Sequence, residues 1–139
     1  MRFVLDTSVI FKILHEEEST EETIELLSLD KDIDFITSDL AVYECGNALL
    51  QVMKRKDQDI SILLGEIFSL ELDLKHNTKE LCSKILENAK QHGITYYDAT
   101  YSTISEEEDA VLVTEDQELI KKAKGVPVRK ALEMAIGKT

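Results

Sequence analysis

Short apolar runs along the chain predict buried β-strands. A run of this kind, bounded by polar residues, is typical of a strand that a sheet covers on both faces. Three segments show it: residues 3–5, residues 34–37 with Phe35 and Ile36, and residues 110–113. Residues 70–74 and 126–128 predict two brief edge strands, the second of which contains Pro127.

Longer stretches between the strands predict helices. They are expected over residues 9–14, after a capping box at residues 19–22, over 40–56 and 59–70, after a second capping box at 77–80 as far as Gly93, over 99–107, from about 117 to 124, and over 130–136. The acidic run 16–18 belongs to a connection. Alternating strands and helices imply a parallel sheet with right-handed crossovers. We therefore predict an α/β fold and a single domain over residues 1–139.

The helix at 40–56 can be resolved by its angular spacing of about 100° per residue. One side carries the apolar residues Val42, Cys45, Leu49, Val52 and Met53. A neighbouring stripe carries Glu44, Asn47 and Gln51, so Glu44 is expected beside the buried face. Gly46 is a poor helix former and indicates either close approach to the backbone or tight helix packing.

Composition and charge narrow the function. The chain has 139 residues, 43% of them hydrophobic and 32% charged, which is typical of an ordinary globular domain. Its 28 acidic and 16 basic residues give a net charge of -12. Bulk attraction to phosphate cannot hold nucleic acid on such a protein, so any contact with nucleic acid must be local or assisted by a metal.

The cysteines and the lengths of the apolar runs indicate the cellular compartment of the protein. Cys45 and Cys82 cannot form a multi-bridge framework and have no metal-ligand spacing, which favours a reducing cytoplasm. Residues 1–10 are too short for a signal peptide and are interrupted by Asp6. No apolar run approaches the ~18 residues that span a membrane. We predict a cytoplasmic protein without a membrane segment.

Four acidic residues, Asp6, Glu44, Asp98 and Asp116, stand where a predicted strand meets a helix or early in a helix. A wound α/β fold gathers such positions at the carboxyl ends of its strands. A pair of carboxylates at ~4 Å costs about 4 kcal/mol at an effective dielectric near 20, so the group must take up protons, stand apart or hold a cation. Each acid alone also has a structural explanation, a helix cap for the three aspartates and a lysine partner for Glu44.

Small polar residues lie close to these acids in sequence. Ser8, Asn47 and Thr114 add hydroxyl and amide groups, and no histidine or cysteine accompanies the set at metal-ligand spacing. Hard oxygen ligands favour Mg²⁺ or Mn²⁺ over zinc or copper. Such a cation can orient a phosphodiester, lower the pKa of a bound water and stabilise a leaving oxygen.

Four segments carry a family resemblance: LDTSVI at 5–10, YECGNAL at 43–49, YYDATY at 96–101 and LVTEDQEL at 112–119. The chain resembles the PIN-domain nucleases, and among them the VapC-like toxins of type II toxin-antitoxin pairs. The resemblance implies a three-layer α/β/α sandwich around a parallel sheet. It also implies an endoribonuclease that depends on Mg²⁺ or Mn²⁺, cuts single-stranded or structured RNA, forms a homodimer and has a cognate antitoxin.

The resemblance assigns roles to the matching residues. Asp6, Glu44 and Asp98 match the family's metal-binding catalytic carboxylates, and Asp116 matches its less constant fourth acid. Three residues match the supporting polar positions: Ser8, Asn47 and Thr114. The histidines at 15, 76 and 92 fall outside the motifs and receive no role.

Basic residues that could contact RNA are few. Lys54, Arg55 and Lys56 end the helix that carries Glu44, and a second cluster comprises Lys121, Lys122, Lys124, Arg129 and Lys130. For any one of these residues, favourable placement of a cation at a helix C-terminus is the simpler explanation. The acidic total suits an antitoxin with a basic segment that reaches the carboxylates.

Two other classes of function stay open. The chain could be a non-catalytic PIN-like module that holds a structural cation or a basic partner, although all four acids are present. Asp6 could instead accept a phosphoryl group. The phosphatase pattern wants a second aspartate where this chain has Ser8, and receiver domains want an early acidic pair and a late lysine after a strand. Neither pattern is evident.

Overall fold

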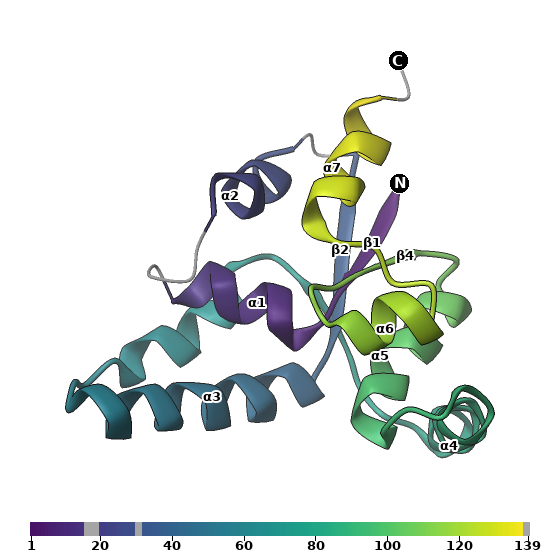
Figure 1. The fold of residues 1–139 in the computed structure, drawn as a ribbon, viewed down its shortest axis with the longest axis horizontal. Helices are drawn as coiled ribbons and strands as arrows, with labels where there is room; N and C mark the ends of the chain where they lie inside the picture. The colour runs from purple at the N-terminus through teal and green to yellow at the C-terminus, as the bar shows by residue number, and fades with distance from the viewer. Residues whose placement is uncertain (16–19, 30–31, 138–139) are drawn as a thin grey trace.

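A four-stranded parallel sheet forms the centre of the described part of the chain, residues 1–15, 20–29 and 32–137 of this computed structural model (Figure 1). The strands are β1 (Arg2–Leu5), β2 (Asp34–Ser38), β3 (Asp73–Lys75) and β4 (Val111–Val113), in the order β3-β2-β1-β4. The three apolar runs are confirmed as strands. At 126–128 the prediction was wrong, because Val126 forms only an isolated bridge with Val113.

Helices surround the sheet. They are α1 (Thr7–Leu14), α2 (Glu21–Leu27), α3 (Leu40–Lys56), the 3-10 helix η2 (Ser61–Ser69), α4 (Lys79–His92), α5 (Tyr96–Glu107), α6 (Gln117–Lys122) and α7 (Val128–Ile136). Strands alternate with helices as predicted, and the parallel α/β architecture is confirmed. No helix in the described residues is long and apolar enough to cross a membrane.

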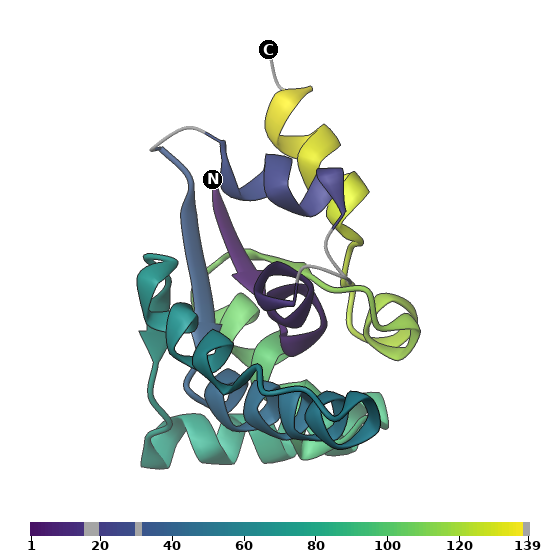
Figure 2. The same ribbon diagram turned by 90° about the vertical axis from the view of Figure 1, so that its left-hand side faces the viewer.

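The helices form two layers, one on each face of the sheet. Helix α5 packs on β1, β2 and β4, and α4 lies behind it. The other layer contains α1 and α3, which contact β1 and β2, and α7, which contacts β4. Figure 2 shows α2 beside α7 in this layer, with η2 running along α3. The predicted three-layer α/β/α sandwich is therefore confirmed.

Helix α5 is enclosed between the sheet and α4. Every residue from 99 to 105 is buried, including serines and threonines. Three of the hydroxyls bond to carbonyls of the same helix, among them Thr100 to Tyr96 at 2.9 Å and Ser105 to Ser102 at 2.7 Å, while Thr103 Oγ1 accepts from Asn88 Nδ2 of α4 at 2.9 Å. Small side chains with satisfied hydroxyls allow this helix to be covered on both sides.

Helix ends differ from the predicted ones where a threonine supplies the cap. Thr20 caps α2 and Thr78 caps α4. The predicted capping boxes begin one residue earlier in each case, at Ser19 and at Asn77. Ser19 and the predicted connection at 16–18 lie outside the described residues. Thr95 caps α5, which therefore starts three residues earlier than predicted. A threonine followed three residues later by a free backbone N–H is sufficient for each cap.

The segment after α3 was predicted as a continuing helix and is a 3-10 helix instead. Helix α3 ends at Lys56, because Asp57 adopts a left-handed conformation with φ of 47°. The chain then resumes after Ile60 as η2, which packs on α3 and α1. Gly46 of α3 faces Leu64 of η2, and a Cβ there would lie 3.5 Å from Leu64 Cδ2. This is an ordinary van der Waals distance, so the packing of η2 on α3 does not by itself require a glycine at this position.

Candidate functional site

The carboxyl ends of β1 and β4 bring Asp6 and Thr114 together. Leu5 pairs with Val113, so the residue after each strand emerges at the same edge of the sheet. Asp6 caps α1 by accepting a hydrogen bond from the Val9 N–H at 3.3 Å. Its carboxylate also accepts hydrogen bonds from Ser8 Oγ at 2.6 Å and from Thr114 Oγ1. Asp6 is thus fixed by Ser8 and Val9 of α1 and by Thr114, which follows β4.

Burial perturbs the charge of Asp6, which is only 4% exposed. Loss of hydration, with a smaller contribution from the Asp116 carboxylate, raises the pKa of Asp6 to about 6. Hydrogen bonds from Ser8, Thr114 and Val9 oppose this shift without cancelling it. The site therefore holds a carboxylate that takes up a proton or a cation more readily than an exposed one.

The loop from Thr114 to Asp116 is tied to the same junction. Thr114 Oγ1 accepts a hydrogen bond from the Asp116 N–H at 2.9 Å, and Ser8 Oγ accepts one from the Glu115 N–H at 3.0 Å. Asp116 caps α6, where its Oδ1 accepts from the Glu118 N–H at 2.8 Å. Ser8 and Thr114, which the sequence placed near the acids, both lie against Asp6.

Glu44 lies on α3 and is held by two hydroxyl groups that sequence reasoning missed. Its Oε1 accepts hydrogen bonds from Thr7 Oγ1 and from Tyr101 Oη, both at 2.6 Å. Burial, and then the neighbouring Glu44 carboxylate, raise the pKa of Tyr101, so its phenol stays a donor. Tyr101 follows Asp98 by three positions in α5 and so shares its helix face, a signal that could have predicted it.

Asp98 lies in the first turn of α5 and is half-buried. Thr95 provides the cap by accepting a hydrogen bond from the Asp98 N–H at 3.0 Å, so Asp98 is not itself the cap. Burial raises the pKa of Asp98, and the charges of Asp116 and Glu44 raise it further. These influences show that the Asp98 carboxylate lies within electrostatic reach of both acids.

The four acids thus gather at one edge of the sheet, with several oxygen atoms left without protein partners. No residue that the structure describes donates a hydrogen bond to Glu44 Oε2, to Asp116 Oδ2 or to the Asp98 carboxylate. In the same described ranges, no lysine or arginine pairs with Glu44, which removes the lysine partner as its explanation. The helix-cap explanation is correct for Asp6 and Asp116 and wrong for Asp98.

These unpaired carboxylate oxygens fit Mg²⁺ or Mn²⁺ by their chemistry, since both ions prefer hard oxygen ligands. As the side chains stand, no group of three or more histidine, cysteine, aspartate or glutamate residues within 1–15, 20–29 and 32–137 is arranged to hold a metal ion. A cation would therefore have to draw the carboxylates closer together. Asp98 and Asp116 are only half-buried, which leaves room for such a change.

Three predicted basic residues lie away from the carboxylates. Lys54, Arg55 and Lys56 occupy the last turn of α3. At 1.5 Å per residue, Arg55 lies about 16 Å along the axis from Glu44, so these side chains are not part of the acidic cluster. Asn47 is exposed and lies one helical turn after Glu44 on the same helix.

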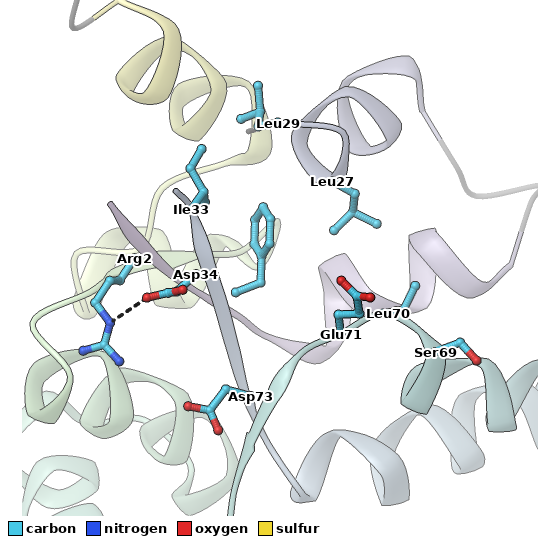
Figure 3. Close-up of a pocket in the computed structure, with 10 residues that line it drawn as sticks. Arg2, Leu27, Leu29, Ile33, Asp34, Ser69, Leu70, Glu71 and Asp73 are labelled. Carbon is cyan, nitrogen blue, oxygen red and sulfur yellow. Dashed lines mark ion pairs between the residues drawn. The ribbon is translucent and has the colours of Figure 1, made fainter. Parts of the chain in front are cut away.

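A hollow of about 650 Å³ lies at the opposite end of the sheet (Figure 3). Arg2, Asp34 and Asp73, the first residues of β1, β2 and β3, line it together with apolar side chains that include Leu27 and Leu70. Figure 3 marks the ion pair between Arg2 and Asp34, 3.7 Å apart. The hollow and the acidic cluster are therefore separate features, at the amino and carboxyl ends of the strands.

Comparison with known sequences finds a family and a relative. A family model described as PIN domain matches residues 3–125. The chain is 31% identical over 126 residues to "Ribonuclease VapC3" of Pyrobaculum aerophilum, covering 88% of this chain and 95% of that protein. The region that the family model matches contains all four acids.

Comparison with solved structures finds the same fold. The protein PAE2754 of Pyrobaculum aerophilum superposes with a TM-score of 0.71 at 23% identity, covering 99% of this chain and 97% of that one. A toxin-antitoxin complex from Klebsiella pneumoniae contains a chain with a TM-score of 0.63 at 11% identity, covering 90% and 96%. At these identities the likeness concerns the arrangement of helices and strands.

Proposed function

Because this chain belongs to the PIN domain family, we propose that it is an endoribonuclease that depends on Mg²⁺ or Mn²⁺ and acts as the toxin of a type II toxin-antitoxin pair. One observation carries the proposal: Asp6, Glu44, Asp98 and Asp116 converge at one edge of the sheet, and three of them keep carboxylate oxygens to which no described residue donates a hydrogen bond. The ribonuclease name of the 31% identical relative supports RNA as the substrate.

The protein's own residues prepare this site. Ser8 and Thr114 hold Asp6 in one orientation, while the Asp98 and Asp116 carboxylates stand ready to complete the ligand set. A divalent cation held by the four acids would orient the phosphodiester, lower the pKa of a bound water and stabilise the leaving oxygen. Burial, and after it the charges of neighbouring acids, raise the pKa of Asp6 and Asp98, and a cation would offset the repulsion between these charges.

We further propose the partners of this nuclease. Lys54, Arg55 and Lys56 would contact RNA away from the scissile bond, since they lie at the far end of α3. A cognate antitoxin would offer a basic segment to the acidic cluster, as the net charge of -12 favours. The likeness to a chain in a toxin-antitoxin complex supports this partner. A homodimer, one domain over residues 1–139 and a cytoplasmic location complete the proposal.

The test is cleavage of RNA by the purified protein with Mg²⁺, with Mn²⁺ and with a chelator. We expect cleavage only with a divalent cation. Asp6→Asn and Asp98→Asn remove one negative ligand each and should lower the rate by more than about 100-fold. Circular dichroism and thermal unfolding check that both variants stay folded. Equal cleavage by a folded Asp6→Asn protein would contradict the assignment.

A second candidate is a non-catalytic PIN-like module that binds a basic protein partner. One observation favours it: within the described residues no three acids are arranged to hold an ion as they stand. The same experiment separates the two candidates. A protein that binds its partner but cleaves no RNA under any of the metal conditions would support the module and overturn the nuclease.

A further inference from the structure

Two hydroxyl groups from different helices converge on a single oxygen of Glu44. Thr7 Oγ1, from α1, and Tyr101 Oη, from α5, each lie 2.6 Å from Glu44 Oε1 on α3. The two hydroxyls are also 2.6 Å from each other. Thr7 and Tyr101 are 94 residues apart in the chain, so this contact exists only in the folded protein. The three oxygens form a closed triangle between α1, α3 and α5.

The triangle treats the two oxygens of Glu44 unequally. Oε1 accepts both hydrogen bonds, and no residue in the described part of the chain donates to Oε2. A glutamate on a helix surface can otherwise rotate about three side-chain bonds and loses this freedom when it binds an ion. Two donors on one oxygen fix the carboxylate before any ligand arrives and leave Oε2 in a defined direction.

The hydroxyl group of Tyr101 is not needed to pack the core. Its side chain is 2% exposed, and a phenylalanine would fill the same volume without a polar atom to bury. The neighbouring hydroxyls of Thr100, Ser102 and Ser105 bond to backbone carbonyls of their own helix. Tyr101 instead directs its hydroxyl across to two side chains, one of which is a candidate metal ligand.

We propose that Thr7 and Tyr101 are positioning residues that occupy Glu44 Oε1 and hold the Glu44 carboxylate in the orientation in which it would bind the divalent cation. This inference rests on the proposed function, because it takes the cation to bind among the four acids. Removal of either hydroxyl should loosen Glu44 and weaken cation binding. Residues that orient a metal ligand typically change metal affinity by about 10–100-fold when they are substituted.

The experiment measures Mn²⁺ affinity without RNA, from the electron paramagnetic resonance signal of free Mn²⁺. Tyr101→Phe and Thr7→Val should each weaken binding by about 10–100-fold. Thr7→Ser keeps the hydroxyl and loses only the methyl group, so it should bind Mn²⁺ nearly as well as the unaltered protein. A purely structural role of Thr7 predicts instead that Ser and Val both leave the affinity unchanged.

Tyr96→Phe is the matched control. Tyr96 lies in the same helix, and its hydroxyl accepts a 3.4 Å hydrogen bond from Asn77 Nδ2 at the surface and interacts with Cys82 of α4. We expect its Mn²⁺ affinity to stay unchanged. Thr7→Val provides the test on its own if Tyr101→Phe does not fold.

The outcomes separate this inference from the proposed function. If the unaltered protein binds Mn²⁺ and the folded Tyr101→Phe and Thr7→Val variants bind it equally well, the inference is overturned while the nuclease proposal stands. If Mn²⁺ binding depends on both hydroxyls but no RNA is cut, the nuclease proposal is overturned and the positioning role stands. An unaltered protein that binds no Mn²⁺ overturns both.

Discussion

Asp6 keeps a carboxylate almost entirely out of water, and this placement has a cost in folding free energy. The unfolded chain ionises this group with the ordinary pKa of 3.8, whereas burial raises the pKa of Asp6 in the folded protein to about 6. Between these values the folded state binds the proton more tightly, so folding stability falls as the pH rises from about 4 to 6. The difference amounts to about 3 kcal/mol in the metal-free protein.

Asp6→Asn should remove this pH dependence. Asparagine is a good helix cap, carries no charge and can still accept hydrogen bonds from Ser8 and Val9. We expect metal-free Asp6→Asn to gain about 2 kcal/mol relative to the unaltered protein when the pH is raised from 4.5 to 7.5. Urea unfolding at the two pH values with a chelator present measures this. If the two proteins differ in unfolding free energy by the same amount at both pH values, the raised pKa of Asp6 is contradicted.

Part of the site was predictable from neighbouring residues in sequence. Asp6 and Ser8 are two positions apart, and parallel pairing of β1 with β4 brings Thr114 to them. The triangle on Glu44 was not predictable in this way, because it depends on how α1, α3 and α5 pack. Asn47 shares a stripe of α3 with Glu44, yet the helix extends beyond the cluster and leaves this amide exposed.

At the scale of elements, the turn between α6 and α7 is pressed against the site. A Cβ on Gly125 would lie 2.5 Å from Thr114 Cγ2 and 3.1 Å from the Leu119 carbonyl oxygen. The Leu119 carbonyl is part of the backbone and cannot easily move, so the added Cβ would force the Thr114 side chain to shift. Thr114 donates a hydrogen bond to Asp6, so the absence of a side chain at Gly125 helps to keep the cluster in place.

Gly125→Ala should therefore affect both stability and the site. Overpacking of this kind costs about 1–3 kcal/mol of folding free energy, and displacement of Thr114 should also weaken Mn²⁺ binding. Gly65→Ala is the control, since no atom lies within 4 Å of its added Cβ, and we expect a change within about 0.5 kcal/mol. Urea unfolding and Mn²⁺ titration measure the two effects. Equal behaviour of both alanine variants would show that Thr114 accommodates the methyl group.

Elements with strong local signals were predicted well, and elements decided by packing were not. Helix α3 runs from Leu40 to Lys56 as expected, with its apolar side buried. Gly93 ends α4 with φ of 64°, as a C-terminal glycine should. The 3-10 helix η2 was missed because apolar spacing alone does not report hydrogen-bond register. Asp57 interrupts the helix by a left-handed conformation, which is uncommon for residues other than glycine although aspartate adopts it more readily than most.

At the scale of the whole molecule, the net charge of -12 opposes the binding of RNA. Attraction must come from local cations, and α3 carries three of them in its last turn. Lys54→Gln, Arg55→Gln and Lys56→Gln together should weaken RNA binding. They should also reduce the slope of log affinity against log salt concentration by up to about 2, at ~0.7 per single-strand phosphate contact.

Fluorescence anisotropy with labelled single-stranded RNA measures this slope, in an Asp98→Asn background that prevents cleavage. The control variant changes Lys121, Lys122 and Lys124 to glutamine and so removes the same total charge from the C-terminal part of the chain. We expect a smaller change in slope for this control. Identical slopes in the two variants would mean that total charge, and not the end of α3, governs RNA attraction.

The hydrogen bonds at the acidic cluster join distant parts of the chain: Asp6 to Thr114, 108 residues later, and Glu44 to Tyr101, 57 residues later. A ribosome that adds about 5–20 residues per second makes Thr114 roughly 5–20 seconds after Asp6. Until then the nascent chain lacks the residue that holds Asp6 from the end of β4 and the fourth acid that follows it. We therefore expect the proposed nuclease to stay incomplete while its first hundred residues are being translated, and prematurely terminated products of that length to lack part of the acidic cluster.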